Sequence, residues 1–72
     1  MDKVKFLLDL AEILEEDEVN ESDVLGDFDA WDSLSILSII AYISEHYQKQ
    51  LKNNEIRGME TISDLISLIE NK

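Results

Sequence analysis

Cysteine and proline are absent from this 72-residue chain, and glycine occurs only at Gly26 and Gly58. Without cysteine the chain has no disulfides, thiolate metal ligands or thiol nucleophile of its own. Small secreted domains usually depend on disulfides, so we expect a cytoplasmic protein. We expect residues 1–72 to form a single domain, which at this size has little room for a deep catalytic cleft.

Basic residues and long apolar runs are also scarce. The chain has six Lys and Arg residues and 17 Asp and Glu residues, which gives a net charge of −11. Nucleic acid binding needs clustered Lys and Arg, so we expect no nucleic acid partner. The charge favours a soluble monomer and docking to basic protein partners. The apolar run Ile39–Ile43 is too short to span a bilayer, and no signal-peptide pattern follows Met1.

Apolar residues recur with helical spacing along most of the chain. The spacing predicts helices from Lys3 to Glu16, from Ser33 to Tyr47, from Asn53 to Arg57, and after Thr61. Expected N-caps are Asp2, Asp32, Asn53 or Asn54, and Thr61 with Asp64 in an approximate capping box. The sequence therefore predicts a small all-α bundle of three longer helices and one short helix, with a long loop between the first two.

The acidic loop from Asp17 to Asp32 is unusually long for a compact domain, and such loops are often functional. We expect its apolar residues to hold it over the core, with one turn near Ser22 to Leu25. These residues are Val19, Val24, Leu25, Phe28 and Trp31.

The predicted helix from Ser33 to Tyr47 is apolar almost all round, which is typical of a central helix or one that shows an apolar stripe to a partner. We expect an inward set made of Ile36, Ile40, Ile43, Leu65 and Ile69, and a shared polar face made of Ser35, Ser38, Tyr42, Glu45 and Lys49. The many β-branched side chains indicate a stiff interior.

Ser33 stands at the head of this helix without a general base or a glycine elbow beside it in the sequence. Such a hydroxyl is a poor catalytic nucleophile. It is a suitable attachment point for a phosphate ester, because helix N-terminal N–H groups stabilise an anion.

Taken together, these residues resemble the acyl carrier protein family. The family motif Asp-Ser-Leu matches Asp32-Ser33-Leu34 after an acidic loop, and the resemblance extends over essentially the whole chain. The aromatic end of the second helix matches Tyr47, and the start of the last helix matches Met59-Glu60-Thr61-Ile62.

The resemblance implies a non-enzymatic carrier in which Ser33 bears a 4′-phosphopantetheine arm from coenzyme A. It implies that Asp32 and Leu34 assist a phosphopantetheinyl transferase, and that acyl-loading and acyl-processing enzymes are further partners. It places Leu34, Leu37, Ala41 and Glu45 on the partner-facing side, although periodicity alone leaves Leu37 equally open to a core position. By the same resemblance Asp32 would help to hold a metal ion at the diester, whereas we expect no metal site in the chain by itself. The stiff interior predicts poor sequestration of long acyl chains.

The chain departs from the usual family pattern at three places. Ala30-Trp31 replaces Gly-Ala before the motif, Lys52 replaces a proline, and serines replace partner-face carboxylates at Ser35, Ser38 and Ser44. These departures indicate a specialised carrier with dedicated partners in a biosynthetic pathway.

Other functions fit parts of the same pattern. An aminoacyl or peptidyl carrier would use the same arm, and an unmodified helical adaptor would use the same apolar stripe. A calcium-binding EF-hand loop starting at Asp27 fails, because Trp31, Asp32 and Ser38 occupy its fifth, sixth and twelfth positions. An enzyme is disfavoured, because the chain has one histidine and no cysteine.

Overall fold

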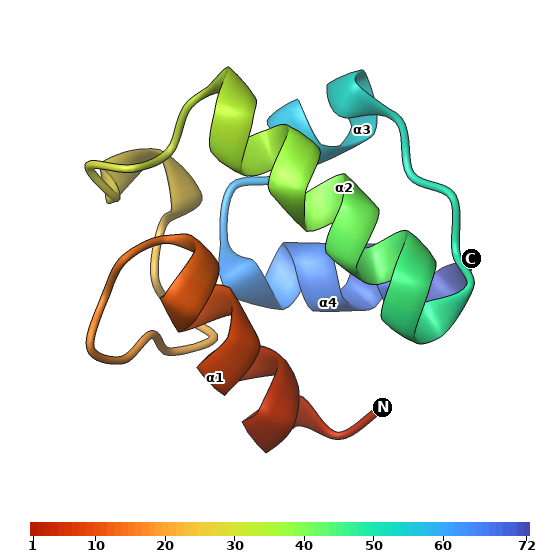
Figure 1. The fold of residues 1–72 in the computed structure, drawn as a ribbon, viewed down its shortest axis with the longest axis horizontal. Helices are drawn as coiled ribbons and strands as arrows, with labels where there is room; N and C mark the ends of the chain where they lie inside the picture. The colour runs from red at the N-terminus through yellow and green to blue at the C-terminus, as the bar shows by residue number, and fades with distance from the viewer.

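Four α-helices and one 3-10 turn make up the computed structural model, which describes residues 1–72 (Figure 1). In chain order they are α1 (Lys3–Ile13), η1 (Leu25–Asp27, the 3-10 turn), α2 (Ser33–Tyr47), α3 (Asn53–Arg57) and α4 (Ile62–Asn71). The chain is 61% helical without strands, so the predicted all-α class is confirmed. None of the helices has both the length and the apolar character needed to cross a membrane.

Helix α1 begins where the sequence predicts but ends before the predicted boundary at Glu16. The Asp2 carboxylate accepts a hydrogen bond from the Lys5 backbone N–H at 3.2 Å and so caps the first turn. After the helix Glu15 has a left-handed φ of 59°, and the Glu16 N–H donates to the Ala11 carbonyl at 2.8 Å. This closure is a Schellman motif, which usually has glycine at the left-handed position. Because Glu15 stands there, the sequence contained no recognisable stop signal.

The acidic loop after α1 is tied to the segment that precedes α4. The Leu25 N–H donates to the Glu60 carbonyl at 2.9 Å, and Val24 pairs with Thr61 in an isolated antiparallel bridge. A turn at Glu21 and Ser22, closed by the Asp23 N–H donating to the Asn20 carbonyl at 3.0 Å, lies at the start of the range predicted for a turn, Ser22 to Leu25. The 3-10 turn η1 begins at the end of that range. The loop is therefore fixed through its backbone, which hydropathy patterns do not report.

Most of the loop's apolar residues pack on the core, as predicted. Val19 and Leu25 are buried, and Phe28 and Trp31 are partly buried against the core. Val24 is the exception, because its side chain is 37% exposed while its backbone pairs with Thr61.

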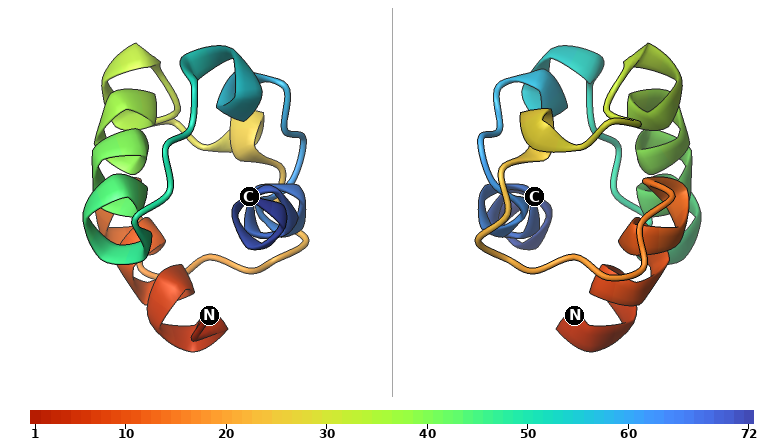
Figure 2. Two further views of the ribbon diagram at one scale, coloured as in Figure 1. Left: turned by 90° about the vertical axis from the view of Figure 1, so that its right-hand side faces the viewer. Right: turned by 90° about the vertical axis from the view of Figure 1, so that its left-hand side faces the viewer.

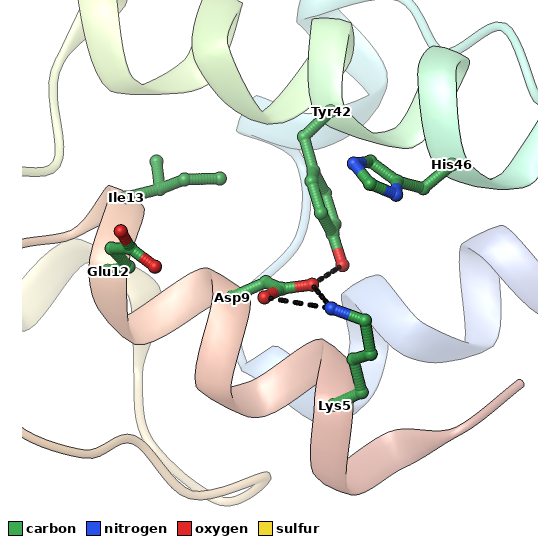
Figure 3. Close-up of a pocket in the computed structure, with 6 residues that line it drawn as sticks. All are labelled: Lys5, Asp9, Glu12, Ile13, Tyr42 and His46. Atoms are coloured by element: carbon green, nitrogen blue, oxygen red, sulfur yellow. Dashed lines mark hydrogen bonds and ion pairs between the residues drawn. The ribbon is translucent and has the colours of Figure 1, made fainter.

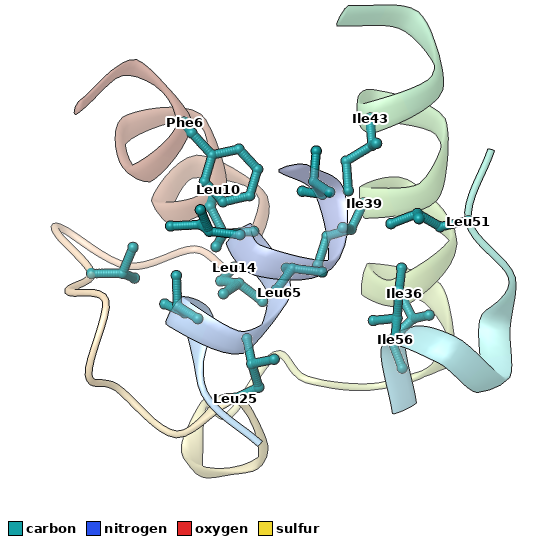
Figure 4. Close-up of a cluster of buried hydrophobic side chains, with 14 of the residues drawn as sticks. Phe6, Leu10, Leu14, Leu25, Ile36, Ile39, Ile43, Leu51, Ile56 and Leu65 are labelled. Atoms are coloured by element: carbon teal, nitrogen blue, oxygen red, sulfur yellow. The ribbon is translucent and has the colours of Figure 1, made fainter. Parts of the chain in front are cut away.

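A single apolar core lies between α2 on one side and α4 on the other, with α1 closing one end (Figures 2 and 4). Of the predicted inward residues, Ile36, Ile43, Leu65 and Ile69 are buried, whereas Ile40 is only partly buried at the edge of α2. Burial of one such side chain stabilises the fold by about 1.5–3 kcal/mol. The core contains Phe6, Leu10, Ala11, Leu14, Val19, Leu25, Ile36, Ile39, Ile43, Leu51, Ile56, Ile62, Leu65, Ile66 and Ile69.

The last two helices start with different caps. The reciprocal bonds between Thr61 and Asp64 at the start of α4 confirm the predicted capping box. Helix α3 has Lys52 at its N-cap position, not Asn53 or Asn54 as predicted. A lysine side chain has no acceptor, so the Glu55 carboxylate instead accepts the Lys52 backbone N–H at 2.9 Å.

A polar contact joins α1 to α2 in an open groove of about 340 Å³ (Figure 3). The Tyr42 hydroxyl donates to the Asp9 carboxylate at 2.6 Å, and the Lys5 ammonium forms an ion pair with the same carboxylate at 3.0 Å. The hydrogen bond from Tyr42 and then that from Lys5 lower the pKa of Asp9, while burial and the bond to Asp9 raise the pKa of Tyr42. Tyr42 therefore remains a hydrogen-bond donor to an ionised carboxylate at neutral pH.

Replacing Tyr42 by Phe should lower the free energy of unfolding by about 1 kcal/mol at neutral pH, because it removes a hydrogen bond to a charged acceptor. Folding lowers the pKa of Asp9, so this contribution is present above the carboxyl's unfolded pKa of about 3.9 and is lost as the pH falls through the lower folded value. Urea unfolding of the wild type and Tyr42→Phe at neutral and acidic pH measures the difference.

The matched background is Asp9→Asn, which keeps an acceptor but has no charge to titrate. In that background the effect of Tyr42→Phe should not change with pH. If Tyr42→Phe lowered the free energy of unfolding by the same amount at neutral and acidic pH with Asp9 present, the result would contradict this account of the contact.

Candidate functional site

Ser33 is the first residue of α2, and its side chain is exposed. The helix begins there because Asp32 and Ser35 cap it reciprocally. The Asp32 carboxylate accepts the Ser35 N–H at 2.9 Å, and the Ser35 hydroxyl accepts the Asp32 N–H at 3.0 Å. The predicted N-cap is therefore confirmed, and the cap places the Ser33 hydroxyl at a fixed point on the surface.

Ser35 does not lie on an exposed polar face as predicted. It is 7% exposed and is the one polar residue among the buried set. Its hydroxyl also donates to the Asp32 carbonyl at 3.0 Å, so it is fully used in the cap. Among the serines expected to replace partner-face carboxylates, Ser35 is thus unavailable to a partner, whereas Ser38 is exposed.

Arg57, which the sequence suggested only as the end of a short helix, contacts the candidate serine. Its Nη2 donates to Ser33 Oγ at 2.9 Å across 24 positions of sequence. Its Nε donates to the Asn53 Oδ1 atom one turn earlier in α3. Helix α3 packs against α2, and this packing brings the guanidinium to the serine. The sequence shows that Arg57 is the only arginine, but it does not show that Arg57 lies beside Ser33.

An exposed stripe runs along α2 from the serine. Leu34 is 73% exposed and Leu37 is 55% exposed, although large apolar side chains are generally buried. Ala41 and Glu45 are also exposed and continue the stripe at helical spacing. Leu37, which periodicity left open between core and surface, therefore lies on the surface with the other three.

An acidic groove of about 460 Å³ lies beside the start of α2. Its lining includes the carboxylates of Glu12, Glu15, Asp29 and Asp32, together with Leu34. Ser33 itself does not line the groove, but its chain neighbours Asp32 and Leu34 do. No residue of α3 lines the groove, and the Arg57 guanidinium contacts Ser33 from α3.

The local chemistry gives the Ser33 hydroxyl no base. Its recorded hydrogen bond comes from Arg57, and a guanidinium has no acceptor and does not lose its proton in proteins. The single histidine, His46, lies in the last turn of α2 and stacks on Tyr42 with ring centroids 4.6 Å apart. An outside base must therefore activate the hydroxyl if it is to react. No group of His, Asp and Glu side chains is arranged to hold a metal ion.

Replacing Asp32 by Ala should lower the free energy of unfolding by roughly 1 kcal/mol, because the Ser35 N–H loses its acceptor. Asp32→Asn should recover most of that loss, since an amide oxygen also caps helices. Urea unfolding monitored by circular dichroism measures both variants. Asp29→Ala is the matched control, because this exposed carboxylate has no hydrogen bond to the helix; an equal loss there would contradict a specific cap.

Comparison with protein-family models, with curated proteins and with solved structures finds no match for this chain. The site is therefore defined by its own residues. Those residues are an exposed serine at a capped helix start, an arginine that contacts it, and an exposed apolar stripe that leads away from it.

Proposed function

We propose that this chain is a carrier protein that presents acyl groups to partner enzymes on a 4′-phosphopantetheine arm attached to Ser33. The single observation that supports this most is the exposed Ser33 hydroxyl at the capped start of α2, next to an exposed apolar stripe. A carrier needs an accessible attachment point and a recognition surface beside it, and both lie on one helix.

The residues around Ser33 fit such an arm. Its hydroxyl is exposed, the backbone N–H groups at the start of a 15-residue helix favour an anion, and Arg57 supplies a cation. When attached, the arm supplies a terminal thiol for thioester formation, which this cysteine-free chain lacks.

The chain's own part in attachment is to present an oxygen. Ser33 Oγ would replace the nucleotide half of coenzyme A at phosphorus, so one phosphorus–oxygen bond forms as another breaks. The hydroxyl proton would pass to a base of the phosphopantetheinyl transferase, because Arg57 cannot accept it. Asp32 would contribute by fixing the helix start on which the transferase docks.

The exposed stripe on α2 would be the surface that partner enzymes recognise. Leu34 and Leu37 offer apolar area close to the serine, and Glu45 offers a carboxylate to a basic partner. With Ser38 exposed where the related family usually has a carboxylate, we propose dedicated partners in a specialised biosynthetic pathway. An aminoacyl or peptidyl cargo would use the same surface.

A second candidate function is that of an unmodified helical adaptor. The exposed Leu34 and Leu37 side chains favour it, because an apolar stripe can bind a partner groove without any arm. The modification state of Ser33 separates the two functions.

Incubation with coenzyme A and a broad-specificity phosphopantetheinyl transferase should add one arm to the wild type, as measured by intact mass. Ser33→Ala should gain none, because the accepting oxygen is removed. Ser38→Ala is the matched control on the same helix and should be modified normally. An unmodified wild type with an intact fold, after several transferases, would favour the adaptor.

Replacing Leu37 by Asp should slow arm attachment about tenfold, because loss of an interface anchor costs about 1.4 kcal/mol or more. The fold should be retained, since the side chain is 55% exposed. Initial rates by mass spectrometry measure the effect. Leu8→Asp on α1 is the control, being 63% exposed and on a different helix. Equal slowing in both variants would point to charge alone and contradict a specific stripe.

A further inference from the structure

We infer that Arg57 is the positioning residue for the phosphodiester formed on Ser33, and that it holds the phosphate end of the arm toward α3. The inference depends on the proposed function, because it needs the arm. It assigns a role to a residue of α3, outside the helix that bears the serine.

The first support is the contact itself. Arg57 Nη2 donates to Ser33 Oγ at 2.9 Å, and Oγ is the atom that would become the ester oxygen. A phosphorus bonded to that atom has its remaining oxygens within reach of the same guanidinium. The Nε–H is already bonded to Asn53, which anchors the side chain along α3. Of the five guanidinium N–H donors, the two Nη1–H groups and one Nη2–H group are left for the phosphate.

The second support is that Arg57 has no ion-pair partner in the structure. The chain has 17 acidic residues and a single arginine. The three ion pairs in the structure use Lys3, Lys5 and Lys72, and none uses Arg57. An arginine that contacts a neutral serine in so acidic a protein is available for an anion. Its planar fork of donors suits phosphate oxygens better than a lysine would.

The third support is the uneven charge around Ser33. The groove beside the start of α2 is lined by the carboxylates of Glu12, Glu15, Asp29 and Asp32. These carboxylates repel an anionic diester, whereas the guanidinium attracts it. The balance directs the phosphate away from the groove and toward α3. The arm would then leave the protein from a defined side.

The test uses the fact that Arg57 is the only arginine, so all guanidinium Nη signals in a nitrogen-15 spectrum belong to it. Intact mass first establishes that the arm is attached. Attachment should then shift the Arg57 Nη signals and slow the exchange of the Nη hydrogens with solvent about tenfold, because the phosphate accepts hydrogen bonds from these groups. High salt should reduce both effects by screening.

The phosphorus resonance of the attached arm gives a second readout. Arg57→Gln should shift it and remove its dependence on salt. Lys52→Gln is the matched control, because it removes one positive charge from the N-cap of α3 without touching the serine, and it should leave the resonance unchanged. Circular dichroism checks that both variants fold.

The outcomes separate the two proposals. An arm confirmed by mass, with an unchanged Arg57 signal and the same phosphorus resonance in Arg57→Gln, would overturn the positioning role and leave the carrier function standing. A wild type that accepts no arm would overturn both, and mass alone identifies that case. Equal phosphorus shifts in Arg57→Gln and Lys52→Gln would reduce the role to general charge and overturn it as well.

Discussion

The reciprocal cap between Asp32 and Ser35 is the interaction on which the candidate site depends. It fixes the residue at which α2 begins, and the helical period then determines which side chains point inward and which point outward. Ser33 becomes the first helical residue, and Leu37 emerges on the surface. A cap moved by one position would turn the whole helix face by about 100° relative to the loop before it. Two short polar side chains thus set the geometry of the site.

The acidic loop is held in place by the opposite end of the chain. Leu25 bonds to the Glu60 carbonyl, and Val24 pairs with Thr61, just before α4. Repulsion between carboxylates in a chain of net charge −11 would otherwise extend so acidic a segment. Because the loop ends at the cap of α2, its attachment to α4 also steadies the helix start. The site therefore depends on segments from both halves of the sequence.

The charges near Ser33 are arranged asymmetrically, with negative charge in the groove beside α2 and positive charge on the α3 side. Carboxylates line the groove beside α2, while Arg57 reaches the serine from α3. The hydroxyl has a donor beside it and no base, which suits an atom that is modified by another protein. Exposed apolar side chains lead away from it along α2. Together these features place an exposed serine, a guanidinium and an apolar stripe on one surface.

Local sequence was enough to predict the helices, part of the core and the cap at Asp32, because helical spacing and capping are properties of a few neighbouring residues. It did not determine the end of α1, where Glu15 takes a left-handed conformation usually left to glycine. It left Leu37 open, since a nearly all-apolar helix has no unique inner face until the other helices pack. Only the tertiary structure brought Arg57 to Ser33, because that contact joins residues 24 positions apart through the docking of α3 on α2.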